Sequence, residues 1–221
     1  MSGLFRKTLT DELRSIIMAC VVCHQPLEQA QEICPDCVQL LSKTSRLFDT
    51  DLQLFSRDWH KMRVLGAYQG LLATLISEGK FSARPELLIH LTRLFADHLR
   101  QTNSCARLPM ISVPMSIWRE LYRGYNQADI IVEQLNRALD NPIINGVIKH
   151  SGPLHTQHKL TKTQRHAQSH QRYVLQGRAP RRVIVVDDVI TTGATMSTIC
   201  RQLKAAGAEY IEVWALALTC K

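Results

Sequence analysis

The segment from Val183 to Thr195 contains the residues whose types and spacing could do chemistry. It places two carboxylates, Asp187 and Asp188, shortly before a loop of hydroxyl-bearing and small residues, namely Thr191, Thr192, Gly193, Ala194 and Thr195. Carboxylates at the end of a strand accept hydrogen bonds from sugar hydroxyls or hold a divalent metal ion. A glycine lets the backbone amides of a loop approach an anion closely, and a helix behind the loop adds a partial positive charge. The segment therefore predicts a site for a phosphorylated sugar.

The residues on either side of this loop predict a strand before it and a helix behind it. The residues from Val183 to Val186 are all β-branched, which is typical of a strand buried on both faces in a parallel sheet flanked by helices. After the loop, apolar residues recur at helical spacing at Met196, Ile199, Cys200, Leu203 and Ala206. An ordinary strand-to-helix turn capped by threonine is the alternative, but two acids followed by such a loop are unusual for a plain connection.

Similar patterns along the chain indicate an α/β fold. They predict a strand and a helix between residues 64 and 76, a long helix that opens at Pro85, a strand at 110–113, a helix at 128–138, a strand at 147–148 and a last strand at 211–218. The last strand closes a β-α-β unit with the strand of the acid pair. Its one charged residue, Glu212, indicates an edge or strand-end position.

Four cysteines near the N-terminus, Cys20, Cys23, Cys34 and Cys37, form two C-x-x-C pairs. In a reducing compartment two such pairs bind zinc, because two thiolates on one tight turn take adjacent corners of a tetrahedron. A redox motif is the alternative for a single pair, but the second pair and the missing β-α-β pattern argue against it. We expect a small zinc knuckle that depends on its metal for folding, followed by a mixed connector over residues 38–60.

The knuckle is acidic, which bears on its role. It contains no lysine or arginine between Cys20 and Cys37, whereas Glu28, Glu32 and Asp36 carry negative charge. This composition favours a structural or partner-docking role over direct contact with DNA.

A second group of candidates combines arginines with aromatic rings. Arg119 and Arg123 stand four residues apart, as do Trp118 and Tyr122, so on a helical turn the guanidinium groups pair and the rings pair. Guanidinium groups suit pyrophosphate oxygens, and rings among cations suit the stacked bases of a single strand. A solvated charged turn with its aromatics in the core is the alternative. Arg119, Arg123 and Tyr125 are our candidates for binding pyrophosphate or DNA.

A basic loop from about residue 149 to 182 precedes the strand of the acid pair. No acidic residue occurs between Asp140 and Asp187, and an acid-free segment of this length is typical of a region that meets a polyanion. We expect a mobile loop over the site, while a disordered basic linker is the alternative. Its histidines lack the spacing of metal ligands and are interpreted as polar surface. Further pyrophosphate or DNA-binding candidates in it are Lys159, Lys162 and Arg165.

Length and composition limit the number of domains, the kind of partner and the location of the protein. A chain of 221 residues can hold one α/β domain with a small appendage, and a net charge of +8 indicates polyanionic partners. No apolar run reaches the length of a membrane span, and the N-terminus lacks the pattern of a signal peptide, so we expect a cytoplasmic protein. We expect residues 1–45 to form the zinc-binding knuckle and residues 46–221 the α/β domain.

The stretch from Val183 to Thr195 resembles the 5-phosphoribosyl-1-pyrophosphate (PRPP) binding motif of type I phosphoribosyltransferases. The resemblance implies that Asp187 and Asp188 bind the ribose hydroxyls and that the loop from Thr191 to Thr195 binds the 5-phosphate. It also implies a type I phosphoribosyltransferase-like parallel sheet flanked by helices, and Mg²⁺ bound with PRPP.

The order of motifs along the chain resembles the ComF family. The motifs are the cysteine knuckle, Ser112-Val113-Pro114, Arg119 with Arg123-Gly124-Tyr125-Asn126-Gln127, Thr156-Gln157 with Leu160 and Arg165, and the PRPP motif. The family (ComFC, also GntX) comprises competence-associated proteins with an N-terminal zinc finger and a phosphoribosyltransferase domain. The resemblance implies handling of internalised single-stranded DNA during natural transformation or its use as a nutrient, with other competence proteins as partners. The chain departs from its relatives at His150, Ser151 and Gln168, where they tend to carry arginine or asparagine.

Two functions from different classes follow. The first is a DNA-handling protein with a PRPP-binding site. The second is an active Mg²⁺-dependent phosphoribosyltransferase that acts on a nucleobase or nucleotide. The sequence favours the ligand site over the reaction, because it identifies neither catalytic residues nor a stretch that recognises a base.

Overall fold

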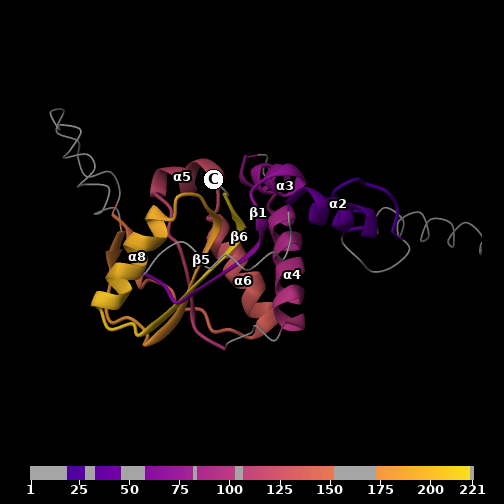
Figure 1. Cartoon of the computed structure of the whole chain (residues 1–221). Helices are drawn as coiled ribbons and strands as arrows, with labels where there is room; N and C mark the ends of the chain where they lie inside the picture. Colours follow the sequence, from indigo (N-terminus) through magenta and orange to yellow (C-terminus); the bar gives the residue numbers. More distant parts are fainter. Residues whose placement is uncertain are drawn as a thin grey trace, which may run out of the picture.

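A four-stranded parallel sheet forms the centre of the computed structural model (Figure 1). The structure describes residues 19–27, 33–45, 58–81, 84–102, 107–151 and 173–219. The sheet has the order β1-β6-β5-β2, with β1 at Lys61–Ala67, β2 at Met110–Ser112, β5 at Arg182–Ile190 and β6 at Tyr210–Leu218. All three strand pairs of this sheet are parallel. A separate antiparallel pair joins β3 (Ile148–His150) to β4 (Tyr173–Leu175).

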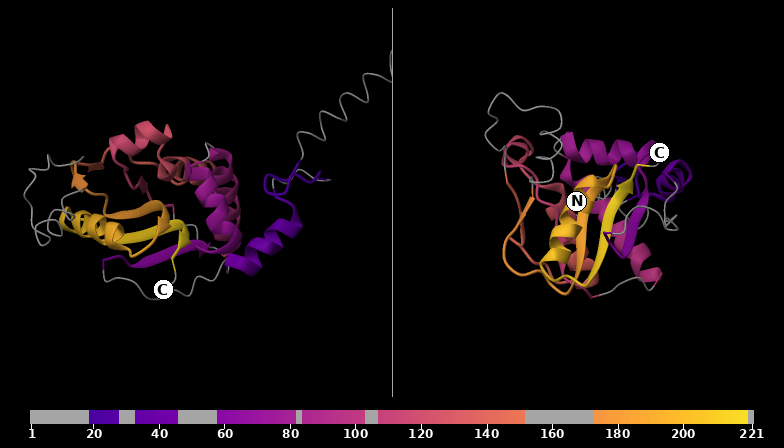
Figure 2. Two further views of the ribbon diagram at one scale, coloured as in Figure 1. Left: turned by 90° about the horizontal axis from the view of Figure 1, so that it is seen from above. Right: turned by 60° about the vertical axis from the view of Figure 1, so that its left-hand side comes forward.

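Helices cover both faces of the sheet (Figures 1 and 2). The helices α3 (Gly70–Phe81), α4 (Pro85–Gln101) and α6 (Gln127–Leu139) lie on one face and α8 (Ala194–Ala205) on the other, whereas α2 (Pro35–Ser45) packs against α3 and α5 (Ile117–Arg123) lies at the end of the sheet. Because side chains alternate along a strand, Ile184 and Val186 pack with the cluster of α3, α4 and α6. Val183 and Val185 point to the other face and pack with α8. The predicted α/β fold, with a buried parallel sheet between helices, is thus confirmed.

The strand that carries the acid pair extends further than the sequence indicates. The short strand β2 pairs with β5 only as far as Ser112 opposite Val186, whereas β6 follows β5 to Ile190. Asp187 and Asp188 therefore lie inside β5 and do not end it, which corrects the expectation that the acids close the strand. They occupy the first residues of β5 that have lost their neighbour on the β2 side. The opening between the two strands begins there.

The last strand, β6, lies in the interior of the sheet between β1 and β5, so the expected edge position of Glu212 is wrong. Glu212 is the third residue of β6 and only 3% exposed. Its carboxylate accepts hydrogen bonds from Tyr210 Oη and Trp214 Nε1, each at 2.9 Å, and lies 3.5 Å from Arg63 Nε. These partners compensate the buried charge, which is why a carboxylate is tolerated in a central strand.

The cysteine segment leads into α2, which packs against the start of α3. The predicted connector at 38–60 therefore begins as helix, as far as Ser45. The Ser45 hydroxyl donates to the carbonyl of Gln69 at 3.0 Å and accepts from the N–H of Leu72 at 3.2 Å, so α2 caps α3. Among the described residues, no helix is both long and apolar enough to cross a membrane.

Candidate functional site

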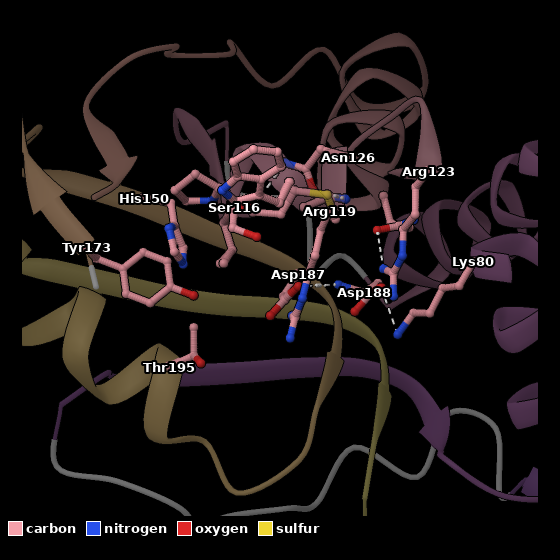
Figure 3. A pocket seen from close by; sticks show the side chains of 16 residues that line it. Lys80, Ser116, Arg119, Arg123, Asn126, His150, Tyr173, Asp187, Asp188 and Thr195 are labelled. Atoms are coloured by element: carbon pink, nitrogen blue, oxygen red, sulfur yellow. Dashed lines mark hydrogen bonds and ion pairs between the residues drawn. The ribbon is translucent and has the colours of Figure 1, made fainter. Parts of the chain in front are cut away.

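A pocket of about 500 Å³ opens where β2 and β5 separate (Figure 3). Both acids of the pair line it, together with the loop residue Thr195. Residues 113–116, which follow β2, form another wall. Cationic side chains from two helices complete it, namely Lys80 of α3 and Arg119 and Arg123 of α5. The pocket thus brings together parts of the chain that are far apart in sequence.

The acid pair is held by the main chain and by one lysine. Asp187 Oδ1 accepts the N–H of Asp188 at 2.8 Å, and Lys80 Nζ lies 2.8 Å from Asp188 Oδ2. Burial raises the pKa of Asp187 to about 8, and the negative charge of Asp188 adds to this rise. The raised pKa favours the protonated form of Asp187 near neutral pH, while Asp188 forms the ion pair with Lys80. Two carboxylates in this arrangement can accept hydrogen bonds from a diol or supply oxygen ligands to Mg²⁺.

The loop from Thr191 to Thr195 borders a second, smaller hollow of about 40 Å³ that shares Asp187 and Thr195 with the main pocket. Gly193 precedes the first turn of α8 with a φ of 73°, a conformation that glycine adopts without strain. The hydroxyl of Thr192 accepts the N–H of Ala194 at 3.4 Å. The loop thus joins the acid pair directly to the N-terminal end of a helix, where unpaired N–H groups suit an anion.

Helix α5 places Trp118, Arg119 and Arg123 at the pocket. Arg123 Nη1 donates to Gln127 Oε1 at 3.2 Å, and its guanidinium lies 4.6 Å from the ring centroid of Phe81. The Arg119 guanidinium has no hydrogen-bond or ion-pair partner among the residues that the structure describes, and in Figure 3 the side chain extends towards the acid pair. Trp118 is 68% and Tyr122 86% exposed, so these aromatics are not part of the core.

The segment that follows α5 has a positioning role. Tyr125 is not among the pocket-lining residues, and its hydroxyl donates to the main-chain carbonyl of Gly79 in α3. Asn126 caps α6 by accepting the N–H of Ala128 at 3.3 Å, and its amide donates to the carbonyl of Val113 at 3.1 Å. Asn126 therefore ties the start of α6 to the wall that follows β2.

Sequence reasoning missed several pocket residues, of which Lys80, His150 and Tyr173 carry chemistry. Lys80 ends a predicted helix and carried no local signal for a site. His150 was interpreted as polar surface and Tyr173 was not singled out, yet both line the pocket from the β3–β4 hairpin, with ring centroids 5.3 Å apart. Gln202 of α8 donates to the carbonyl of Tyr173 at 2.7 Å and fixes the hairpin there. The candidates Lys159, Lys162 and Arg165 lie outside the described residues.

The four cysteines of the N-terminal segment form a cluster that could hold a metal ion. The sulfur atoms of Cys20, Cys23, Cys34 and Cys37 all lie within 4.8 Å of one another. Cys20 Sγ accepts the N–H of Cys34 at 3.3 Å, and Cys34 Sγ accepts the N–H of Cys37 at 3.4 Å. Burial opposes ionisation of Cys20, but hydrogen bonds from backbone amides outweigh it and lower its pKa to about 6. Backbone N–H groups donate to two of the four sulfur atoms, whereas burial and the neighbouring cysteines raise the pKa of Cys37. A metal ion held by all four sulfur atoms would favour their thiolate forms, which is the chemistry of a structural zinc site.

Comparison with known proteins agrees with this geometry. Residues 121–219 match the family model described as the phosphoribosyl transferase domain. The chain is 36% identical over 167 residues to Competence protein F of Haemophilus influenzae, covering 72% of this chain and 73% of that one. The chain belongs to the ComF family. A second relative, the DNA utilization protein YhgH of Escherichia coli O157:H7, is 31% identical over 209 residues and 90% of both chains.

Among solved structures, this ComF-family chain is similar to the adenine phosphoribosyl transferase of Trypanosoma brucei, solved with AMP, pyrophosphate and ribose-5-phosphate. The TM-score is 0.40 and the sequence identity 18%, over 70% of each chain.

Proposed function

We propose that this ComF-family protein acts in DNA uptake and utilisation by handling single-stranded DNA, and that its pocket binds PRPP. One observation carries the proposal: Asp187, Asp188 and the loop residue Thr195 line the same pocket as the cations Lys80, Arg119 and Arg123. A ligand with a diol and phosphate groups at two positions matches this distribution of charge. PRPP has that chemistry.

The parts of PRPP match different parts of the site. The ribose hydroxyls would donate to Asp187 and Asp188, and the 5-phosphate would accept N–H groups of the loop at 191–195. The two acids are also the residues that would hold Mg²⁺, which supplies positive charge to the diphosphate. In this arrangement Arg119 and Arg123 would bind diphosphate oxygens with their guanidinium groups.

DNA would bind on α5 and not in the acid-lined pocket. Deoxyribose lacks the 2′-hydroxyl, and within a strand its 3′-oxygen is bonded to phosphate, so the acid pair would find no free diol. Helix α5 offers the exposed rings of Trp118, at the rim of the pocket, and of Tyr122 next to two arginines, which suits stacked bases and their phosphates. The remaining candidates, Tyr125, Lys159, Lys162 and Arg165, stay proposals for the same role.

The second candidate function is active transfer of a phosphoribosyl group to a base. The cations that line the pocket favour it, because they could stabilise the diphosphate that leaves when a base nitrogen bonds to C1 of the ribose. We further propose that the metal of the cysteine cluster is structural zinc and that the protein works in the cytoplasm, where thiols stay reduced.

Calorimetry with PRPP and Mg²⁺, together with fluorescence anisotropy on a labelled single strand, tests the first function. We expect binding in both experiments. Absence of heat with PRPP would remove the proposed ligand. Release of pyrophosphate from PRPP in the presence of one base, and not without it, would select the transferase instead.

A further inference from the structure

The last turn of α3 is held at three consecutive residues by three other parts of the molecule. Glu78 pairs with Arg84 at 2.9 Å, and Arg84 Nη2 also donates to the carbonyl of Val21 in the cysteine segment at 3.3 Å. Gly79 gives its carbonyl to the Tyr125 hydroxyl. Lys80, the third of these residues, contacts Asp188 of β5. The backbone position of Lys80 beside the pocket is therefore fixed by contacts outside the pocket.

Close packing adds to this constraint. A Cβ atom on Gly79 would lie 2.8 Å from Leu88 Cγ of α4, so the α3 backbone lies directly against the next helix. Such a turn has little room to shift. Lys80 can reorient its flexible stem, but its Cα cannot withdraw from the site.

The Lys80 ammonium lies at one side of the acid pair, well shielded from solvent. Its side chain is 14% exposed and that of Asp188 13%. In the view of Figure 3, Lys80 and Arg123 lie on one side of Asp187 and Asp188, and Thr195 lies on the other. A phosphorylated ribose with its 5-phosphate at the loop and its diol on the acids would turn its C1 substituent away from the loop.

We propose that Lys80 is the residue that selects ligands with a second anionic group, the diphosphate of a phosphoribosyl diphosphate, over ribose 5-phosphate. This inference rests on the proposed function and deepens it. An ammonium has three donors, so Lys80 can keep its contact to Asp188 and give the others to phosphate oxygens. Asp188 holds this cation at the pocket, so the Lys80 ammonium already lies beside the acid pair before the diphosphate binds. Arg119 and Arg123 reach the pocket from α5, whereas Lys80 reaches it from the clamped turn of α3.

The test compares two ligands on three proteins by calorimetry at one fixed Mg²⁺ concentration. The ligands are PRPP and ribose 5-phosphate, and the proteins are the full-length chain, Lys80→Met and Lys80→Arg. Loss of one charge-assisted hydrogen bond in a shielded site corresponds to a fall in PRPP affinity of roughly tenfold to a hundredfold. Ribose 5-phosphate affinity should change less than about threefold, because its contacts lie at the loop and the acids. Lys80→Arg should recover part of the PRPP affinity.

Lys61→Met is the matched control, since Lys61 is exposed and begins β1, at the end of the sheet away from the pocket. Thermal unfolding of each variant establishes that it is folded. If the full-length protein binds PRPP and Lys80→Met binds it equally well, or loses both ligands by the same factor, the selective role of Lys80 is wrong. If the full-length protein binds neither ligand, the proposed function itself fails, and the inference fails with it.

Discussion

The main-chain N–H of Asp188 donates to the carboxyl of Asp187 at 2.8 Å, inside a strand that has just lost its neighbour. This geometry buries one acid beside another. Burial and the adjacent charge raise the pKa of Asp187 from 3.8 to about 8. The charged form of Asp187 suits ligand binding, whereas burial disfavours that form and lowers the stability of the fold. Ligand binding and stability therefore place opposite demands on this residue.

The raised pKa of Asp187 gives stability a defined pH dependence. Between about pH 4 and 8 the folded chain keeps a proton on Asp187 that the unfolded chain has lost, so the free energy of unfolding should fall as pH rises through this window and level off above it. Asp187→Asn should remove this component and raise the melting temperature at pH 8. Urea unfolding at several pH values measures the free energy of unfolding, and thermal unfolding at pH 8 measures the melting temperature. Asp129→Asn, an exposed acid on α6, is the control, and parallel profiles for wild type and Asp187→Asn would contradict the prediction.

The paired substitution Asp187→Asn with Asp188→Asn should abolish PRPP binding and leave the fold intact. Amides cannot accept hydrogen bonds from a diol as strongly as carboxylates or hold Mg²⁺, whereas neither side chain belongs to the two apolar clusters. Calorimetry and circular dichroism together check this. A doubly substituted protein that is folded and keeps its PRPP affinity would place the ligand elsewhere.

Two sets of substitutions test the proposed DNA-binding role of α5: one removes positive charge and the other removes a stacking ring. Replacing Arg119 and Arg123 by glutamine should weaken single-strand binding and lower the slope of log K against log salt by about 1.4, at about 0.7 for each phosphate contact. Tyr122→Ala should weaken binding by about 1–3 kcal/mol with an unchanged slope, because stacking releases no counterions. Anisotropy titrations at several salt concentrations separate the two effects. Arg137→Gln on the exposed side of α6 is the control, and an unaltered slope in the double variant would exclude the two arginines from the interface.

Arg84 offers a test at a distance from the pocket. It does not line the pocket, yet it joins Glu78 of α3 to Val21 of the cysteine segment. Arg84→Met should lower PRPP affinity by a smaller factor than Lys80→Met, because the lysine remains but its supporting turn is loosened. Calorimetry under the same conditions measures the difference, with Arg100→Met at the far end of α4 as control. Equal affinity for wild type and Arg84→Met would show that the clamp on α3 does not matter for binding.

The cysteine cluster predicts one zinc ion for each chain after purification under reducing conditions. Removing it with a chelator should lower the melting temperature, because Val21, Val22 and Ile33 pack against the main core and need the cluster to hold their segment in place. Elemental analysis and thermal unfolding before and after chelation provide the measurement. A protein that contains no zinc, or that melts identically after treatment, contradicts this assignment.

Local pattern was sufficient to predict the centre of the site. The β-branched run, the acids, the loop and the apolar helix face are contiguous, so β5, the loop and α8 could be predicted from their spacing alone. The same holds for α4, where Pro85 opens a helix with a regular apolar face.

Contacts between distant residues could not be predicted in this way. Lys80 contacts the acid pair only because α3 ends near the point where β5 no longer pairs with β2. No sequence pattern near residue 80 indicates this contact. Glu212 was misplaced for the same reason, since its partner Arg63 comes from β1 and makes an interior position tolerable. His150 and Tyr173 reach the pocket through a hairpin whose strands are separated by more than twenty residues of sequence.

None of the residues of α5 is buried, although the helix stands at the mouth of the pocket. Substitutions on it therefore leave the packing of the sheet almost untouched, and selection can act there on ligand preference alone. The ligand contacts of α5 can therefore be altered one side chain at a time while the scaffold that carries the pocket stays folded.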